Sequence, residues 1–507
     1  MTTDVRSYKM SNMKSVLRTI FVLICGGVAI FTLFLTMMPM LNRVANSNND
    51  FLTYYKYSFE NVFNTEKNTD LNSESFIPPK TSVDMSQANL NNSTLLNIEA
   101  SNTSITSTTD SIHTEFEKSN SEYLSDFLFD FSWEKLEDGI NNSSVTSYRQ
   151  RLIDGLQKFA LKEPLVPINE SCQPPPLLDP NDIRCSDYSM AFRDNKYESP
   201  VKVAHAIQLG FDADSLEIHL NEIYDVVDHF FILEATRLHC LAMRKQLSWS
   251  ELSSQPRFSK FREKVVHLIV DDVDLVAVKW SKDASFKLEH LQELIRWRKI
   301  KKWNEVTKSL KGRDIIGFGD ADEVPSRKNI QLLKYCPLKF KSIDIGIWFP
   351  FGRMDQAYKS DFPVSKDHKY TLGDPTFYMW KRATELVEPE YPTRKRGLSK
   401  GYLLGGIHLT YYTYVPYFML RILSATECSP NKEQIRTWFI DPLKNFTKTR
   451  SLEGLESHIE KRKNVTHLEM IKDVKENVSD VISPPWFYEC NQDRYPAWLG
   501  KHDTRVT

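Results

Sequence analysis

The sequence carries no surplus of charge of either sign. Its 507 residues include 65 Lys and Arg against 66 Asp and Glu, which gives a net charge of −1 at pH 7. A protein that binds nucleic acid usually shows a basic excess, because its partner is a phosphate polymer. We therefore expect no nucleic acid partner. With 41% hydrophobic and 26% charged residues, the chain can form one large or two medium globular domains.

Charge is also missing from one segment near the amino terminus, residues 19–42. A helix of these 24 residues would be long enough to cross the hydrocarbon core of a bilayer. Four basic residues and a single acid precede it, which predicts a cytoplasmic tail over 1–18 and a signal-anchor of type II orientation. A cleaved signal peptide is disfavoured, because the apolar stretch is too long and Met38-Pro39-Met40 offers no small-residue cleavage site.

Cysteine is scarce, with seven in the chain. Cys25 falls within the predicted anchor, and the other six would face an oxidising lumen, where fifteen pairings are open to them. These six are Cys172, Cys185, Cys240, Cys336, Cys428 and Cys490. No N-x-S/T acceptor for N-glycosylation precedes the anchor. The acceptors that follow it are Asn91, Asn92, Asn102, Asn141, Asn142, Asn169, Asn445, Asn464 and Asn477. Both features indicate a lumenal main body.

Three further segments differ in composition. Residues 43–122 are rich in Ser, Thr and Asn without a sustained hydrophobic period, which predicts a flexible, disordered stem. Residues 123–199 predict two short helices followed by a Pro-rich linker. This segment either packs on the next domain or forms a neck, and the sequence leaves both open. Residues 200–507 are predicted to form the main lumenal domain.

Strands and helices alternate through the first half of that domain. Apolar runs predict strands over 201–207, 229–234, 264–270 and 315–318. Helical spacing of apolar residues predicts one helix after the first strand, over 216–227, and another before the fourth, over 288–311. This order is typical of an α/β fold with a mixed, mainly parallel sheet of Rossmann type.

The stretch 314–325 brings two acids to the end of a strand. An apolar strand leads into Asp320-Ala321-Asp322, and Pro325 should prevent the strand from continuing. On an extended chain Asp320 and Asp322 would point to one side and Glu323 to the other. Two crowded carboxylates suit Mg²⁺ or Mn²⁺ held jointly with substrate phosphates. This is the D-x-D arrangement of nucleotide-sugar transferases, although a D-x-D by itself is common.

Four ordered blocks resemble one protein family. They are LEIHLNEIYDVVD (216–228), FILEA (231–235), DADEVP (320–325) and GGIHLTYY (405–412). Together they resemble glycosyltransferase family 17, the β-1,4-mannosyl-glycoprotein 4-β-N-acetylglucosaminyltransferase family. The resemblance implies a GT-A-like fold, a UDP-GlcNAc donor, Mn²⁺ (or Mg²⁺), an inverting transfer to a mannose of an N-glycan or other mannose-containing glycan, and a Golgi membrane location. Three features depart from the pattern: His219, Ile407 and the segment after Glu234.

The resemblance also implies roles for particular residues. Asp322 would touch the metal, and Asp320 would hold ribose or metal-bound water. His408 would be the third protein ligand, with a structural histidine beside an aromatic run as the alternative. Glu217 and Glu234 are candidates for nucleotide contact, with ordinary structural roles as the alternative. An inverting transfer needs a general base, normally a carboxylate. The candidates are Asp374 and Glu427, although either could be an ordinary turn or surface acid. The basic run Arg394-Lys395-Arg396 by itself predicts a solvated loop, with contact to the acceptor or to donor phosphate as the alternative.

Two other functions stay open at this stage. D-A-D-E-V also fits the D-x-D-x-[T/V] start of haloacid-dehalogenase-like phosphatases, in which the first Asp is the nucleophile. That motif normally opens its domain, whereas more than a hundred residues of apparent sheet and helix precede it here. A membrane-tethered lumenal protein that binds glycans without turnover is the second alternative.

Overall fold

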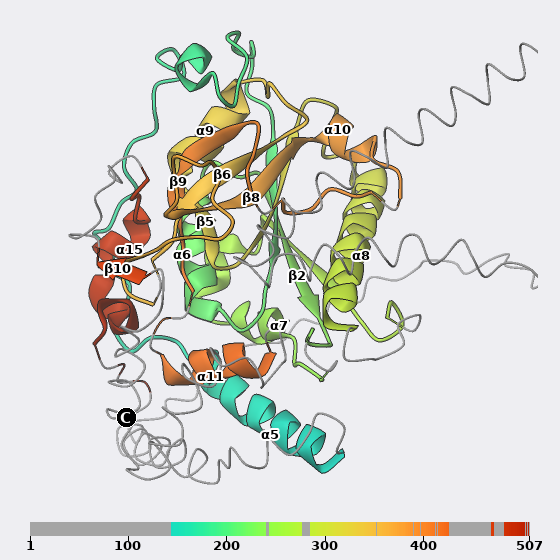
Figure 1. The fold of residues 1–507 in the computed structure, drawn as a ribbon, viewed down its shortest axis with the longest axis vertical. Coiled ribbons are helices and arrows are strands. Elements are labelled where there is room, and N and C mark those ends of the chain that lie inside the picture. Colours follow the sequence, from blue (N-terminus) through green and yellow to red (C-terminus); the bar gives the residue numbers. More distant parts are fainter. Residues whose placement is uncertain are drawn as a thin grey trace, which may run out of the picture. The chain divides into compact units, whose positions relative to one another are not determined.

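In the computed structural model, the unit Ser104–Thr507 contains all described residues (Figure 1). The structure describes residues 143–239, 243–275, 284–350, 352–388, 390–395, 397–410, 412, 414–424, 468–470, 481–501, 503 and 505. The predicted tail, the anchor over 19–42, the stem over 43–122 and Glu427 lie outside these ranges. Among the helices within them, none combines the length and the apolar character needed to cross a membrane.

An eight-stranded sheet forms the centre of the unit, with strand order β3-β2-β1-β4-β8-β6-β9-β5. Its strands are β1 (Val203–Gln208), β2 (His229–Ala235), β3 (Val265–Val270), β4 (Ile315–Asp320), β5 (Glu323–Pro325), β6 (Ser342–Trp348), β8 (Thr371–Met379) and β9 (Tyr402–His408). A separate two-stranded sheet pairs β7 (Gln356–Tyr358) with β10 (Leu468–Met470).

The sheet is mixed and mainly parallel, as predicted. Strands β3, β2, β1 and β4 are parallel neighbours. Strand β8 runs antiparallel to both β4 and β6, β6 and β9 are parallel, and β5 is antiparallel to β9. The carboxyl ends of β1 and β4 therefore meet at one edge of the sheet, where Gln208 pairs with Asp320.

Helices cover both faces of this sheet. They are α5 (Ser143–Ala160), α6 (Ala213–Ile223), α7 (Ser248–Leu252), α8 (Ala284–Thr307), α9 (Arg327–Tyr335), α10 (Trp380–Thr384), α11 (Val415–Ser424) and α15 (Trp486–Cys490). Short 3-10 turns occupy Cys185–Tyr188, Pro256–Phe261, Gln492–Arg494 and Pro496–Leu499. Helices α6 and α9 pack on one face and α8 on the other, so successive residues of β1 contribute to different cores (Figure 1).

The predicted order of strand, helix, strand, strand, helix, strand is confirmed, and α8 ends at Thr307, four residues before the predicted end at 311. One local expectation was wrong. Pro325 does not end all pairing after the acids, because the chain turns over Ala321 and Asp322 and then forms the short strand β5 against β9. Since β5 is the edge strand of the sheet, Pro325 is tolerated there without a partner on its other side.

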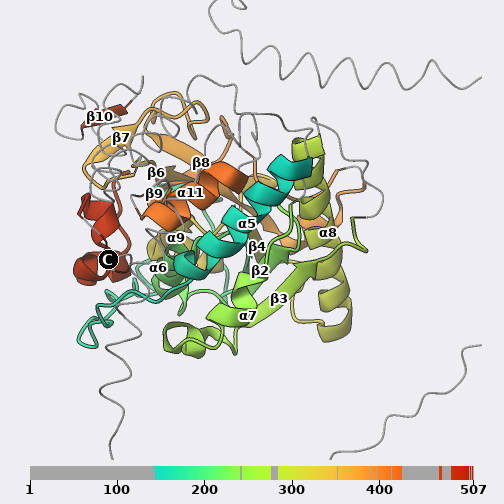
Figure 2. The same cartoon turned by 90° about the horizontal axis from the view of Figure 1, so that it is seen from below.

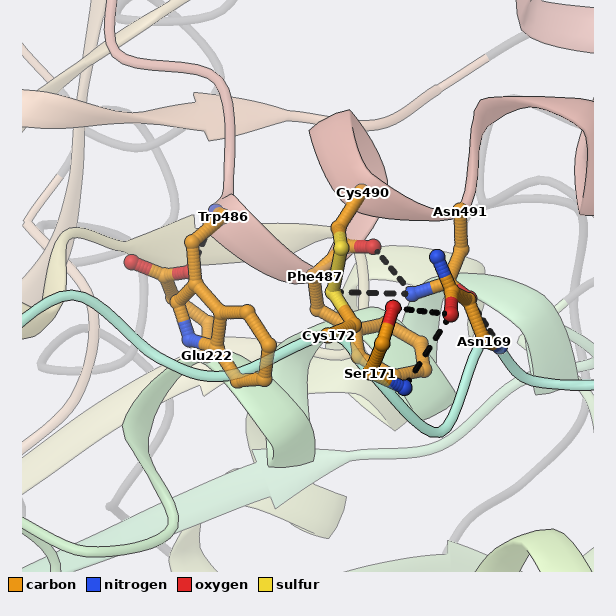
Figure 3. Close-up of a disulfide and its surroundings, with 8 residues drawn as sticks. All are labelled: Asn169, Ser171, Cys172, Glu222, Trp486, Phe487, Cys490 and Asn491. Atoms are coloured by element: carbon orange, nitrogen blue, oxygen red, sulfur yellow. Dashed lines mark hydrogen bonds between the residues drawn. A yellow bond between two sulfur atoms is a disulfide. The ribbon is translucent and has the colours of Figure 1, made fainter.

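The segment before residue 200 packs on the same unit. Helix α5 lies against α11 (Figure 2), and their apolar residues share a core with α15. Two disulfides tie the segment down: Cys172 to Cys490, drawn in Figure 3, and Cys185 to Cys336. Of the two placements that the sequence left open for 123–199, the described part, from Ser143 onward, packs on the domain.

Candidate active site

The D-x-D acids lie in a turn whose backbone is fixed on both sides. Strand β4 ends at Asp320, and the N–H of Ala321 donates to the carbonyl of Gln208 at the end of β1, at 3.0 Å. The N–H of Leu409, just after β9, donates to the carbonyl of Asp322 at 2.7 Å. Three strand ends therefore meet at this turn, at the carboxyl edge where open α/β sheets bind ligands.

Asp322 is buried beside His408. Its Oδ2 lies 3.4 Å from His408 Nε2 and 4.0 Å from Arg421 Nη2. Burial alone would raise the pKa of Asp322, but His408 and the charge of Arg421 hold that pKa well below its usual range. The His408 ring packs against Phe349, with centroids 4.6 Å apart. Asp322 is therefore an ionised carboxylate held in one place.

Two glycines allow strand β9 to bring His408 to this point. Gly405 and Gly406 have φ of 124° and 128°, a region that side chains other than glycine rarely adopt. A Cβ on Gly406 would lie 2.4 Å from the carbonyl oxygen of Val324 on the neighbouring strand. The Gly-Gly pair is therefore needed for the close approach of β9 and β5.

Asp320 forms an ion pair with Arg394, and here two local expectations were wrong. Arg394 is buried rather than in a solvated loop, and one of its Nη1 hydrogens is donated to Asp320 Oδ2. Glu323 does not point away from Asp320, because its Oε2 accepts from the Asp320 N–H at 2.9 Å and its Oε1 lies 3.1 Å from Arg394 Nη1. The turn over 321–322 interrupts the extended chain on which the expectation was based.

Arg394 also reaches helix α8. Its Nη2 lies 3.1 Å from Glu289 Oε1, and its Nε lies 3.5 Å from Glu293 Oε1. Four carboxylates therefore surround one guanidinium group that is only 4% exposed. Burial opposes the charge of Arg394, but these acids raise its pKa well above the ordinary value.

Sequence reasoning missed Asp212, which lies just before α6. The side chain is buried, and within the described part of the chain its Oδ1 has no hydrogen-bond partner. Burial, together with the negative charge of Asp322, raises the pKa of Asp212 to about 6. Its only local signal is its place at the residue before a helix, where an Asp is common.

Glu217 is held in an ion-pair network. One oxygen of this fully buried carboxylate lies 3.0 Å from Arg257 and the other 2.9 Å from Arg494. The network ties α6 to the 3-10 turn before β3 and to the carboxy-terminal segment. Both oxygens thus have a guanidinium partner, which is the structural role that the sequence left open for Glu217.

Glu234, at the end of β2, is also fully engaged. Its Oε1 accepts from Lys245 Nζ at 2.6 Å and from the N–H of Ser248, and its Oε2 accepts from the N–H of Trp249. His267 Nε2 lies 3.0 Å from the same Oε2. Burial opposes ionisation, but Lys245 and the hydrogen bonds lower the pKa of Glu234 to about 2. This carboxylate anchors the first turn of α7.

Of the two candidates for the general base, one lies within the described residues. Asp374 is buried on β8. The last register pair between β4 and β8 joins Phe318 to Thr376, so Asp320 and Asp374 each lie two residues beyond it at the same end of the sheet. Glu427 lies outside the described residues.

The three residues expected to bind a metal are not gathered into one set of ligands. Asp322 and His408 lie together, whereas Asp320 is paired with Arg394. In the part of the chain that the structure describes, no group of three His, Cys, Asp or Glu side chains is arranged to hold a metal ion.

Comparison with known proteins finds a match for the first part of this domain. Residues 182–346 match the sequence model of glycosyltransferase family 17. This region is similar to family 17 over about a third of the chain. It contains β1 to β4 and the whole D-x-D turn, whereas His408, Asp374 and Arg394 lie beyond it.

Two relatives agree with the family 17 match. Both are named beta-1,4-mannosyl-glycoprotein 4-beta-N-acetylglucosaminyltransferase, one from Rattus norvegicus and one from Homo sapiens. Each is 24% identical over 137 residues, which are 27% of this chain and 24% of the relative. The chain thus spans about a quarter of the length of the curated relatives it matches. The family and both names support an enzyme.

Proposed function

We propose that this protein is a metal-dependent, inverting glycosyltransferase of GT-A-like fold. It transfers N-acetylglucosamine from UDP-GlcNAc to a mannose of an N-glycan or another mannose-containing glycan. One observation carries the proposal. Within the segment that matches family 17, strand β4 leads into a D-x-D turn at the carboxyl edge of a mixed sheet. The transferred N-acetylglucosamine and the mannose-containing acceptor follow the names of the two relatives, and UDP as the carrier follows the D-x-D resemblance.

The charge around the turn fits a divalent cation. Among the described residues, electrostatic interactions around the turn connect carboxylates to guanidinium groups. The carboxylates are Asp212, Glu289, Glu293, Asp320, Asp322 and Glu323, and the guanidinium groups are Arg296, Arg394 and Arg421. Six acids thus face three guanidinium groups, in a largely buried region where an excess of negative charge is costly. Among the described residues, Asp320 Oδ1 and Asp322 Oδ2 are buried and make no hydrogen bond.

Asp322 and the Oδ1 of Asp320 would hold this cation, with substrate phosphates as its other ligands. Mn²⁺ or Mg²⁺ bound by one or two carboxylates together with phosphates is a common arrangement. The cation would stabilise the diphosphate charge that grows as the glycosidic bond breaks. His408 would keep Asp322 in position, and Arg394 would hold Asp320 Oδ2, so that Oδ1 faces the donor.

For inversion, a base must remove the proton from the attacking mannose hydroxyl. We assign this role to Asp374, because it lies at the same sheet edge as Asp320. Glu427 is retained as the second candidate.

We further propose a single-pass type II protein of the Golgi membrane, anchored by residues 19–42, with the domain in the lumen. Both disulfides agree with an oxidising compartment.

The test is donor turnover by the full-length chain in detergent, with several nucleotide sugars and Mn²⁺. We expect UDP release from UDP-GlcNAc that stops with EDTA and falls at least about 100-fold in Asp322→Asn, because the charge that holds the cation is lost. Glycan binding without turnover of any donor would support the lectin alternative. Hydrolysis of a simple phosphate ester would support the phosphatase.

A further inference from the structure

A buried histidine on α6 contacts the backbone of the D-x-D turn. His219 is fully buried, and its Nδ1 lies 3.1 Å from the carbonyl oxygen of Ala321, the residue between the two acids. A carbonyl oxygen only accepts hydrogen bonds, so Nδ1 carries the hydrogen and donates it. The N–H of Ala321 donates in turn to Gln208. Both sides of Ala321 are therefore fixed.

The same face of α6 contacts the chain that follows His408. Ser215 lies one helical turn before His219, at the i and i+4 spacing that places side chains on one face. Its hydroxyl donates to the carbonyl of Leu409 at 3.3 Å, and the N–H of Leu409 donates to the carbonyl of Asp322. The two side chains thus brace two backbone segments: one carries the D-x-D acids and the other carries His408.

A second buried histidine, His205, contacts the other ring nitrogen of His219. His205, on β1, places its Nδ1 3.4 Å from His219 Nε2, and the two rings are 5.0 Å apart. Both side chains are completely inaccessible to solvent. This contact orients the His219 ring toward the turn, because a buried ring with partners on both nitrogens has little freedom to rotate.

We propose that His219 is a positioning residue of the active site, with Ser215 as its weaker companion. His219 holds the Ala321 carbonyl so that Asp320 and Asp322 keep the spacing that a divalent cation needs. The inference rests on the proposed metal-dependent function.

A matched pair of variants tests it. His219→Asn keeps an N–H donor close to the place of Nδ1, whereas His219→Leu has similar size and no donor. In the full-length chain, we expect His219→Leu to weaken Mn²⁺ binding by about 10-fold or more and to lower turnover of UDP-GlcNAc, as loss of a supporting residue typically does. His219→Asn should stay within about 3-fold of wild type. Mn²⁺ binding is read from the metal-induced rise in Tm in the presence of UDP, which supplies the phosphate ligands, independently of turnover.

The outcomes separate this proposal from the function on which it rests. If wild type shows neither a Tm rise with Mn²⁺ nor turnover, the proposed function fails. If wild type shows both and His219→Leu binds Mn²⁺ as tightly, the positioning role is overturned. Should His219→Leu not fold, Ser215→Ala, which removes only a hydroxyl, replaces it. A 2- to 5-fold weaker Mn²⁺ affinity in Ser215→Ala then supports the brace, and an unchanged affinity overturns it.

Discussion

At the scale of single residues, Arg394 concentrates the electrostatics of the site. One guanidinium group contacts Asp320 and Glu323 from the turn and two glutamates of α8. Removal of a buried arginine of this kind lowers stability mainly because buried carboxylates are left without a counter-ion. The energy of its own ion pairs is the smaller part. Arg394 also lies 74 positions beyond Asp320 in the chain, so no local sequence pattern predicts the contact between them.

We predict that Arg394→Gln destabilises the fold by about 3–5 kcal/mol and abolishes turnover, because four carboxylates lose their shared counter-ion. Arg394→Lys should recover part of the stability, since it restores the charge but not the planar fork. Urea unfolding measures the stability of both variants, and UDP release measures their turnover. The control is Arg298→Gln on α8, whose pair with Glu388 is about half exposed and should change stability by less than about 1 kcal/mol. Equal stability of Arg394→Gln and wild type would contradict this account.

At the scale of elements, the central strand β6 contains a buried acid. Asp344 accepts a hydrogen bond from Thr376 of β8 at 2.6 Å. Burial raises the pKa of Asp344 to about 7, from an ordinary value of 3.8, despite that bond. A carboxyl with a raised pKa in the folded state makes stability fall as pH rises, because the folded protein keeps a proton that the unfolded chain has lost.

We predict that Asp344 lowers the free energy of unfolding as pH rises from about 4 to about 7, by no more than about 4 kcal/mol. Asp344→Asn should remove this part of the pH dependence, because Asn can still accept from Thr376 and does not ionise. Urea unfolding of both proteins at pH 5 and pH 8 measures the difference. A variant whose loss of stability between the two pH values equals that of wild type would refute the prediction.

The segment before β1 presents one glycosylation acceptor within the described residues. Asn169 is exposed, and its Oδ1 accepts from the hydroxyl of Ser171 at 2.7 Å. Figure 3 shows this motif beside the disulfide Cys172–Cys490, where the Asn169 N–H donates to Asn491 Oδ1. The acceptor side chain is thus on the surface although the surrounding backbone is fixed.

We predict an N-linked glycan at Asn169 when the chain is made in cells with a secretory pathway. Both residues of the acceptor motif are exposed, which the modification requires. Peptide mapping after enzymatic deglycosylation should show Asn169 converted to Asp, and Ser171→Ala should abolish this conversion while it leaves glycans at other sites. An unmodified Asn169 peptide from such cells would show that the chain does not enter the lumen or that the site is not used.

At the scale of the whole molecule, residues 143–199 are integral to the described unit. Helix α5 covers an apolar core shared with α11 and α15, and the Tyr414 hydroxyl donates to the carbonyl of Phe159 at 2.7 Å. The two disulfides cross-link residues 318 and 151 positions apart, and closing long loops in this way restricts the unfolded chain.

We predict that a chain truncated to begin at residue 200 is insoluble, because it exposes the core under α5 and leaves Cys336 and Cys490 without their partners. A chain that begins at residue 123 should fold. Soluble yield and thiol titration after secretion compare the two. A soluble, active protein from residue 200 onward would place the true boundary of the domain there.

Much of the fold could be predicted because its signals are local. Apolar runs and helical spacing located β1 to β4, α6 and α8, and the position of Asp320 and Asp322 at a strand end followed from the run before them. The features left open depend on contacts outside any local pattern. Glu217 and Glu234 had two roles open to them, and the choice depends on partners 11 to 277 positions away in the chain.

The sequence by itself determined the α/β alternation, the D-x-D turn and the resemblance to family 17, because each depends on neighbouring residues. Only the tertiary structure decided that Arg394 is buried, that Asp212 joins the acids, that Glu323 turns back toward Asp320 and that His219 braces Ala321. The reason is physical. A charge is stabilised by whatever partner the folded chain brings within a few ångströms, and in a sheet of non-sequential strands that partner comes from a distant segment.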